Sequence, residues 1–229
     1  MPRPRVFLAD DHTMFVDALR IMLARMCDVV GVAPNGREVL ASLRTTNPDV
    51  VILDMGMPLL NGLDTARQIR RLNPRIKLIM LTVDDDPDLA AEALRAGISG
   101  YLLKTSVGTE LTDAIAATLK GDRYVTKQML SRMEEVFVRW GTRSILKRSL
   151  TSRQREVLQL LAEGRTMKEA AKILKLTSRT IAFHKYRIME LHGIKTTADL
   201  IRFAQDQRML GVPDNAPHPH PSLRTAYQA

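Results

Sequence analysis

The 229-residue sequence holds a single cysteine and no long apolar run. One cysteine, Cys27, excludes an internal disulfide framework and is typical of proteins that work in a reducing compartment. No stretch approaches the ~20 apolar residues that a membrane-spanning helix needs. The first apolar run ends early, at Asp10 and Asp11, so a secretory signal is not expected. We therefore expect a cytoplasmic protein without a membrane partner.

Charge is distributed unevenly along the chain, whose formal net charge is +9. Residues 1–125 hold 15 Lys and Arg against 16 Asp and Glu, a net charge of −1. Residues 126–150 have a net charge of +4, residues 151–212 of +6, and residues 213–229 of zero. A basic C-terminal half beside a near-neutral N-terminal half suggests an anionic partner for the second half, with nucleic acid as the first candidate.

Short apolar runs alternate with helical patterns over the first 121 residues. Runs typical of β-strands occur at 5–9, 29–33, 50–53, 77–82 and 100–103. Helical patterns lie between them, at 14–25, 37–44, 63–72, 87–96 and 108–120. This alternation predicts an α/β domain over residues 1–121, with a five-stranded, doubly wound parallel sheet and helices on both of its faces.

The strand patterns are absent beyond about residue 127. We expect a basic, partly helical linker over 122–150, followed by a small all-α domain over 151–212. Four short helices are expected in that domain, and two of them start with the capping boxes Thr151–Gln154 and Thr166–Glu169. The tail at 213–229 is rich in proline and poor in apolar residues, so we expect it to be disordered.

Polar side chains follow the ends of four predicted strands: Asp10 and Asp11, then Asp54, Thr82 and Lys104. Taken singly, an aspartate here could cap a helix or turn, Thr82 could be an ordinary strand residue, and Lys104 could be a surface lysine. Ligands of such sheets collect at the carboxyl ends of the strands, where these groups meet. Three carboxylates repel one another unless a cation joins them, and Mg²⁺ prefers oxygen ligands. An aspartate can also act as a nucleophile and form an aspartyl phosphate.

Four motifs occur in order over residues 4–121: "LADDH", "VVILDMGMPLLNG", "LT" and "GYLLK". In type and spacing they resemble the receiver domain of two-component response regulators. The resemblance implies that Asp54 accepts a phosphoryl group from a partner histidine kinase or a small phosphodonor. It also implies that Mg²⁺ is bound by Asp11, Asp54 and the backbone carbonyl of Gly56, with Asp10 holding it through water.

The same resemblance assigns a signalling role to residues around this site. Lys104 would pair with the phosphoryl oxygens, Thr82 would move to hydrogen-bond to the phosphoryl group, and Tyr101 would swing inward behind it. Thr105 follows Lys104 where many receivers have proline, so a cis X-Pro bond is absent there. The unusually acidic "VDDDPD" at 83–88 is interpreted as a solvated loop that leads into the next helix.

The basic half resembles the LuxR-type helix-turn-helix of NarL/FixJ response regulators over "LTSRQREVLQLLAEGRTMKEAAKILKLTSRTIAFHKYRIMELHGIKTTADL". A helical wheel of its last long helix places a core stripe on one face, made of Thr180, Ile181, His184, Ile188 and Leu191. The outward face is mixed, with Arg179, Ala182, Phe183, Tyr186 and Glu190, flanked by Lys185 and Arg187. His184 on the core stripe is interpreted as a packing residue.

This outward face predicts a helix that enters the major groove of DNA. Arg179 is expected to contact a base edge or a phosphate, and Ala182 and Phe183 to contact thymine methyl groups. The complete set of expected DNA-binding residues is Lys168, Thr177, Ser178, Arg179, Ala182, Phe183, Lys185, Tyr186, Arg187 and Lys195. Two residues depart from the family pattern: Ala182 stands where many members have lysine, and Met167 where asparagine is commoner.

Together these features predict a response regulator in which phosphorylation of Asp54 controls homodimerisation and sequence-specific binding to double-stranded DNA. We expect it to catalyse only its own phosphoryl transfer and dephosphorylation. Two alternatives remain: a phosphatase with an aspartyl-phosphate intermediate, and a receiver whose output domain binds protein. The phosphatase is disfavoured because such enzymes place the nucleophile on the first strand with a second Asp two residues later.

Overall fold

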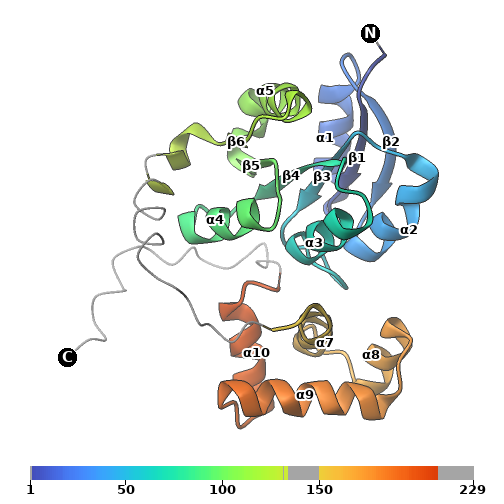
Figure 1. Ribbon diagram of the computed structural model, residues 1–229, viewed down its shortest axis with the longest axis vertical. Coiled ribbons are helices and arrows are strands. Elements are labelled where there is room, and N and C mark those ends of the chain that lie inside the picture. The colour runs from blue at the N-terminus through green and yellow to red at the C-terminus, as the bar shows by residue number, and fades with distance from the viewer. Residues whose placement is uncertain (1, 131, 134–149, 211–229) are drawn as a thin grey trace.

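The structure is a computed structural model and describes residues 2–130, 132–133 and 150–210 (Figure 1). Strands and helices alternate in the first part of the chain, as the sequence predicts. Its elements are β1 (Arg5–Ala9), α1 (Thr13–Leu23), β2 (Asp28–Ala33), α2 (Gly36–Thr46), β3 (Val50–Asp54), α3 (Gly62–Leu72), β4 (Lys77–Thr82), α4 (Pro87–Arg95), β5 (Gly100–Leu103), η1 (Lys104–Ser106), α5 (Val107–Lys120) and β6 (Tyr124–Val125).

The described strands form one parallel sheet in the order β2-β1-β3-β4-β5-β6. Alternate strand residues enter two separate cores, one under α2, α3 and α4 and the other under α1 and α5. Every residue of β3 is buried, since both faces of the sheet are covered, and this explains its continuous apolar run. The predicted doubly wound α/β fold is confirmed.

One strand differs from the prediction. β6 is a two-residue strand that pairs with β5, inside the segment assigned to the linker, so the sheet has six strands in the described residues instead of five. Two residues are too short for a periodic pattern to reveal them. Residues 127–130 and 132–133 are helical, which agrees with a partly helical linker. The rest of the predicted linker and the whole of the predicted disordered tail lie outside the described residues.

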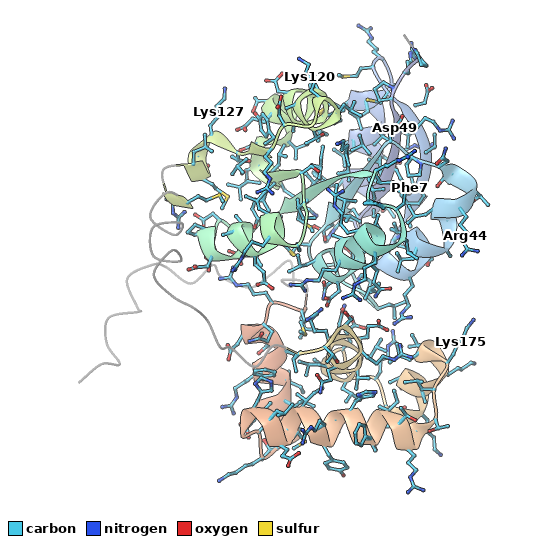
Figure 2. All side chains as sticks on the ribbon, in the orientation of Figure 1. Phe7, Arg44, Asp49, Lys120, Lys127 and Lys175 are labelled. Atoms are coloured by element: carbon cyan, nitrogen blue, oxygen red, sulfur yellow. The ribbon has the colours of Figure 1, made fainter. Side chains whose placement is uncertain are left out.

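A glycine allows the first two strands to pack around an aromatic ring. The pairing of β1 with β2 shifts register after Val6, which places Phe7 opposite Gly31. A Cβ at Gly31 would lie 2.3 Å from the Phe7 ring, so only glycine leaves room for it there. Figure 2 shows Phe7 inside the receiver part. Cys27 is buried and free.

The C-terminal part consists of helices α7 (Ser152–Ala162), α8 (Met167–Leu174), α9 (Ser178–His192) and α10 (Thr197–Asp206). Both predicted capping boxes are present, and a third joins Thr196 to Asp199 at the start of α10. Gly164 and Gly193 follow α7 and α9 with positive φ angles of 81° and 66°, the conformation that ends helices. Among the described residues, no helix is long and apolar enough to cross a membrane.

Candidate functional site

Strand register brings the predicted acidic residues together at one edge of the sheet. β1 and β3 pair in parallel, so Asp10 and Asp54, which follow paired residues Ala9 and Leu53, end at the same level. Asp10 and Asp54 are both buried, whereas Asp11 is exposed. Neither Asp10 nor Asp11 caps α1, whose N-cap is His12 and has no side-chain cap bond. The alternative that these aspartates serve as helix caps is therefore wrong.

Lys104 joins two of these carboxylates. Its Nζ lies 2.7 Å from Oδ2 of Asp10 and 2.9 Å from Oδ1 of Asp54. Burial acts to lower the pKa of Lys104, but the charges and hydrogen bonds of the two aspartates outweigh burial and raise the pKa above its usual value. Lys104 is therefore a fixed positive charge beside Asp54.

The surroundings of Asp54 raise the pKa of its carboxyl group above the usual value. Burial and the nearby charge of Asp10 raise its pKa, although the ammonium of Lys104 and the backbone N–H of Gly56 act to lower it. That N–H donates to Oδ2 of Asp54 over 3.0 Å and fixes one carboxylate oxygen. A buried carboxylate that is poorly solvated and positioned by two donors is suited to nucleophilic attack.

The carboxylates can also form a metal site. Ligand atoms of Asp10, Asp11, His12 and Asp54 all lie within 4.8 Å of one another. Three carboxylates fit the oxygen preference of Mg²⁺. His12 is not among the metal ligands predicted from the sequence, although it lies within the motif "LADDH". Its Nδ1 is 2.9 Å from Oδ1 of Asp10, and mainly this hydrogen bond raises the pKa of His12.

The two predicted switch residues lie beside this pocket and contact the loop after β4. Thr82 is buried, and its Oγ1 accepts a hydrogen bond from the backbone N–H of Asp84 over 3.0 Å. Tyr101 is fully buried, and its hydroxyl is 3.5 Å from the carbonyl oxygen of Asp84. The Tyr101 ring is therefore already inside, so an inward swing on phosphorylation stays a prediction.

The acidic loop (Asp84, Asp85 and Asp86) differs from the solvated loop that the sequence suggests. Asp84 and Asp86 are half-buried and both form ion pairs with Arg208, which follows α10. This contact was not predicted from the sequence, because Arg208 lies 122 residues beyond Asp86 in the chain. Only Asp85, paired with Arg132, keeps a mainly exposed side chain.

The predicted DNA-reading residues occupy an exposed face of the helix-turn-helix. Thr177 caps α9 through the N–H of Thr180, and Ile181 and Ile188 are buried as the helical wheel predicts. Phe183 and Tyr186 are 65% and 63% exposed on the opposite side. The remaining predicted residues are also at or near the surface: Lys168, Ser178, Arg179, Arg187 and Lys195 are exposed, and Ala182 and Lys185 are half-buried.

The helices of the C-terminal part contact the receiver through α7 (Figure 1). Gln159 is buried and bonds to Asn61 and to the carbonyl oxygen of Met57, in the loop that follows Asp54. Glu163 accepts from the N–H of Leu59 over 3.0 Å, and burial raises the pKa of Glu163. We call this set, with the ion pair between Arg155 and Asp64, the α7–receiver contact.

The α7–receiver contact leaves the DNA-reading face open. Figure 1 shows α7 on the side of the helical part that faces the receiver, and α9 beyond it on the far side. The high exposure of Phe183 and Tyr186 is consistent with this arrangement. The receiver therefore contacts a surface of the helix-turn-helix other than the one predicted to read DNA.

Comparisons with known proteins match both parts of the chain. Residues 6–116 match the family model of the response regulator receiver domain, and residues 148–204 match that of bacterial regulatory proteins, luxR family. The chain is 32% identical over 207 residues to the transcriptional regulatory protein MctR of Rhizobium johnstonii, covering 90% of this chain and 94% of the relative.

Two solved structures are also similar over most of the chain. One is RcsB from Salmonella enterica serovar Typhimurium bound to promoter rprA with the phosphomimetic BeF3⁻, with 28% identity, a TM-score of 0.55, and coverage of 90% of this chain and all of that chain. The other shows two RcsB dimers bound to two parallel DNAs, with 26% identity, a TM-score of 0.56, and coverage of 89% and 98%.

Proposed function

The chain belongs to the response regulators that join a receiver domain to a LuxR-family DNA-binding domain, and we propose that phosphorylation of Asp54 controls its dimerisation and its binding to DNA. The family is one of transcriptional regulators and not of conventional enzymes. The observation that carries the proposal is the pocket in which Lys104 lies within 3 Å of both Asp10 and Asp54. We place the protein in the cytoplasm, beside its kinase and its DNA.

Asp54 is the phosphoryl acceptor in this proposal. One of its oxygens attacks the phosphorus of a phosphohistidine on the partner kinase, the P–N bond breaks, and its electron pair returns to the imidazole nitrogen. Lys104 is placed to donate to the transferred oxygens, because its Nζ already contacts the Asp54 carboxylate. Attack of water on the acyl phosphate later returns Asp54 to its carboxylate.

Asp10, Asp11 and Asp54 would hold Mg²⁺, together with the backbone carbonyl of Gly56. When bound, the ion neutralises the charge that develops on the oxygens of the phosphoryl group in transfer. Without a cation, three carboxylates and an incoming phosphoryl group would repel one another, and Lys104 alone supplies one positive charge. Phosphorylation should therefore require Mg²⁺.

Regulation follows from where α7 and α9 lie. Because the α7–receiver contact leaves Phe183 and Tyr186 exposed, the proposed control does not depend on masking of the DNA-reading face. Thr82 and Tyr101 instead transmit the new charge on Asp54 to the loop after β4, and this biases the chain toward a dimer. A symmetric dimer binds two DNA half-sites at once. This raises the affinity for DNA although each DNA-binding domain makes the same contacts as before. The dimers of RcsB on DNA are consistent with such an arrangement.

Within the DNA-binding domain, α9 would enter the major groove. Arg179, Ala182 and Phe183 are the predicted base-reading residues, with Thr177, Ser178 and Tyr186 beside them. Lys168, Lys185, Arg187 and Lys195 would neutralise phosphates. Arg187 is partly engaged already, because its Nη1 is 2.7 Å from Oε2 of Glu190.

The proposal is tested by measuring molecular mass and DNA affinity with and without Mg²⁺ and beryllofluoride. The mimic should raise the dimer fraction and tighten binding to an operator fragment, and the Asp54→Asn chain should show neither response. Equal mass and equal affinity in both states would overturn phosphorylation control. Affinity that does not change with salt would argue instead for an output domain that binds protein.

A further inference from the structure

The acidic loop receives arginines from two separate segments. Arg208 spans two of its carboxylates: its Nη1 is 2.7 Å from Oδ2 of Asp84, and its Nη2 pairs with Asp86. Arg132, which precedes the DNA-binding domain, places its Nη1 2.6 Å from Oδ2 of Asp85. Both flanks of the DNA-binding domain thus meet the same short loop of the receiver.

The Arg208 contact is the stronger of the two. The side chains of Arg208, Asp84 and Asp86 are 29%, 32% and 21% exposed, whereas those of Arg132 and Asp85 are 48% and 57% exposed. Partial burial reduces screening by water and salt, so both ion pairs of Arg208 are screened less than an exposed pair, and Nη2 of Arg208 also donates a hydrogen bond to Asp86. The exposed pair between Arg132 and Asp85 is of the kind that contributes little.

The position of Arg208 is fixed by the fold of the DNA-binding domain. Its backbone has a φ of 52°, in the left-handed region, and its N–H donates to the carbonyl of Gln205 over 2.8 Å. Met209 then turns back into the core of the domain, where it is buried. The left-handed backbone conformation of Arg208, which few non-glycine residues adopt, therefore directs its side chain toward the receiver. Met209 anchors the chain beside it.

The loop that receives Arg208 also contacts the switch residues. Oγ1 of Thr82 accepts from the N–H of Asp84, and the hydroxyl of Tyr101 faces the carbonyl of the same residue. Asp54 pairs with Leu81, next to Thr82, so the acidic loop begins three residues after the strand neighbour of Asp54. Thr82 thus holds the backbone of Asp84, the residue whose carboxylate pairs with Arg208.

We propose that Arg208, Asp84 and Asp86 form a clamp that fastens the DNA-binding domain to the receiver, and that movement of Thr82 toward a phosphorylated Asp54 loosens it. The second part rests on the proposed function, and the first does not. The clamp acts beside the α7–receiver contact, which holds the loop after β3. The domain is thus attached to the loop after β3 and to the loop after β4.

A distance measurement on the full-length, unphosphorylated chain tests the clamp without DNA. Spin labels are placed at Arg44→Cys on α2 and Lys175→Cys at the end of α8, two exposed positions on opposite sides of the junction (Figure 2). Buried Cys27 is replaced by alanine throughout. The clamp is removed by Arg208→Asn, because asparagine tolerates the left-handed conformation. The parent chain should give a narrow distribution of distances.

Arg208→Asn, and separately Asp84→Asn with Asp86→Asn, should raise the ratio of undocked to docked molecules about tenfold, equivalent to about 1.4 kcal/mol. Asp85→Asn and Arg202→Gln, which alter neighbouring exposed charges, should leave the distribution unchanged. Combining Arg208→Glu with Asp84→Lys and Asp86→Lys should restore docking by reversing the charges. An unchanged distribution in both clamp variants, with normal thermal unfolding, overturns the clamp.

The link to phosphorylation is tested on the same labelled chain. Beryllofluoride with Mg²⁺ should move the parent distribution toward that of Arg208→Asn and should change the Arg208→Asn distribution little. A parent chain that stays docked although Asp54 carries the mimic overturns the link but leaves the clamp. Failure of the proposed function has a different signature, since DNA affinity would then ignore the mimic even where the distances respond.

Discussion

The side-chain oxygen of Gln159 accepts two hydrogen bonds from Asn61, one from its backbone N–H at 3.0 Å and one from its side-chain amide at 3.1 Å. The two residues are 98 positions apart and both are buried, at 1% and 3% exposed. Asn61 also caps α3, because its Oδ1 accepts from the N–H of Asp64. The start of α3, after the loop that follows Asp54, is therefore bonded directly to the DNA-binding domain.

Replacing Gln159 by alanine should weaken the α7–receiver contact. The amide of Asn61 and the carbonyl of Met57 would lose their partner, which costs about 1–3 kcal/mol if they stay buried. In the Gln159→Ala chain we expect calorimetry to resolve two unfolding transitions, one for each part of the chain. In the parent chain these two transitions should overlap more. The matched control is Gln205→Ala on the exposed side of α10. Identical transitions in all three chains would contradict a stabilising role for Gln159.

Asp54→Asn should abolish labelling by a small phosphodonor in the presence of Mg²⁺. The amide is close in size to the carboxylate but is not a nucleophile. The pocket therefore keeps its shape and loses the group that would accept the phosphoryl group. Asp85→Asn, at an exposed acidic residue, should be labelled as the parent is. The readout is incorporation of phosphate by intact-mass spectrometry. Labelling that persists in Asp54→Asn would show that another residue is the acceptor.

The acidic pocket could be predicted from the sequence because parallel strands end at one edge. Each of its residues follows an apolar run: Asp10, Asp54, Thr82 and Lys104. Because these runs form parallel strands, the residues at their carboxyl ends must lie at the same edge of the sheet. The core of α9 was predictable for a similar reason, since Ile181 and Ile188 repeat with the period of a helix.

The contacts between the two parts could not be predicted in this way. Glu156 and Gln159 are polar residues of α7 that resemble a solvated face, yet both are buried, with Glu156 paired to Arg37 and Gln159 bonded to Asn61. Their burial depends on how two folded parts dock, and no local pattern encodes that orientation. Arg208 was missed for the same reason, because its partners come from a loop far away in the sequence.

Gly62→Ala should disturb the position of Asp54. Gly62 is the first residue of α3, and a Cβ there would lie 2.1 Å from the carbonyl oxygen of Asp54. Relief of that clash must displace the end of β3 or the helix, so we expect a loss of about 1–3 kcal/mol in unfolding free energy. The rate of phosphorylation should also fall. Urea titration and phosphate incorporation give the two readouts.

Gly108→Ala in α5 is the control for this substitution. A Cβ at Gly108 meets nothing within 4 Å, and alanine is favoured over glycine inside a helix by roughly 0.5–1 kcal/mol. Gly108→Ala should therefore be neutral or stabilising and should keep its phosphorylation rate. If both alanine variants behave alike, close packing of α3 against β3 is not what requires glycine at position 62.

Acidification should destabilise the DNA-binding domain partly through His184. Burial, with the nearby charge of Arg153, lowers the pKa of His184 below its ordinary value of 6.5. The unfolded chain then binds this proton more readily than the folded chain, so stability falls as the pH drops through about 6.5 toward the folded pKa. His184→Gln should flatten this dependence in urea titrations between pH 7.5 and 5.5. An unchanged pH dependence would show that His184 is equally solvated in both states.

Lys185→Ala should weaken DNA binding about equally for all sequences. Lys185 flanks the exposed face of α9, where Phe183 and Tyr186 project, so it is placed to contact a phosphate and not a base edge. Loss of one phosphate contact should reduce the slope of log affinity against log salt concentration by about 0.9. Lys120→Ala on α5, far from α9 in Figure 2, should leave the slope unchanged. The test is to measure DNA affinity at several salt concentrations for two unrelated operator sequences. A change in the ratio of the two affinities would assign Lys185 to base recognition instead.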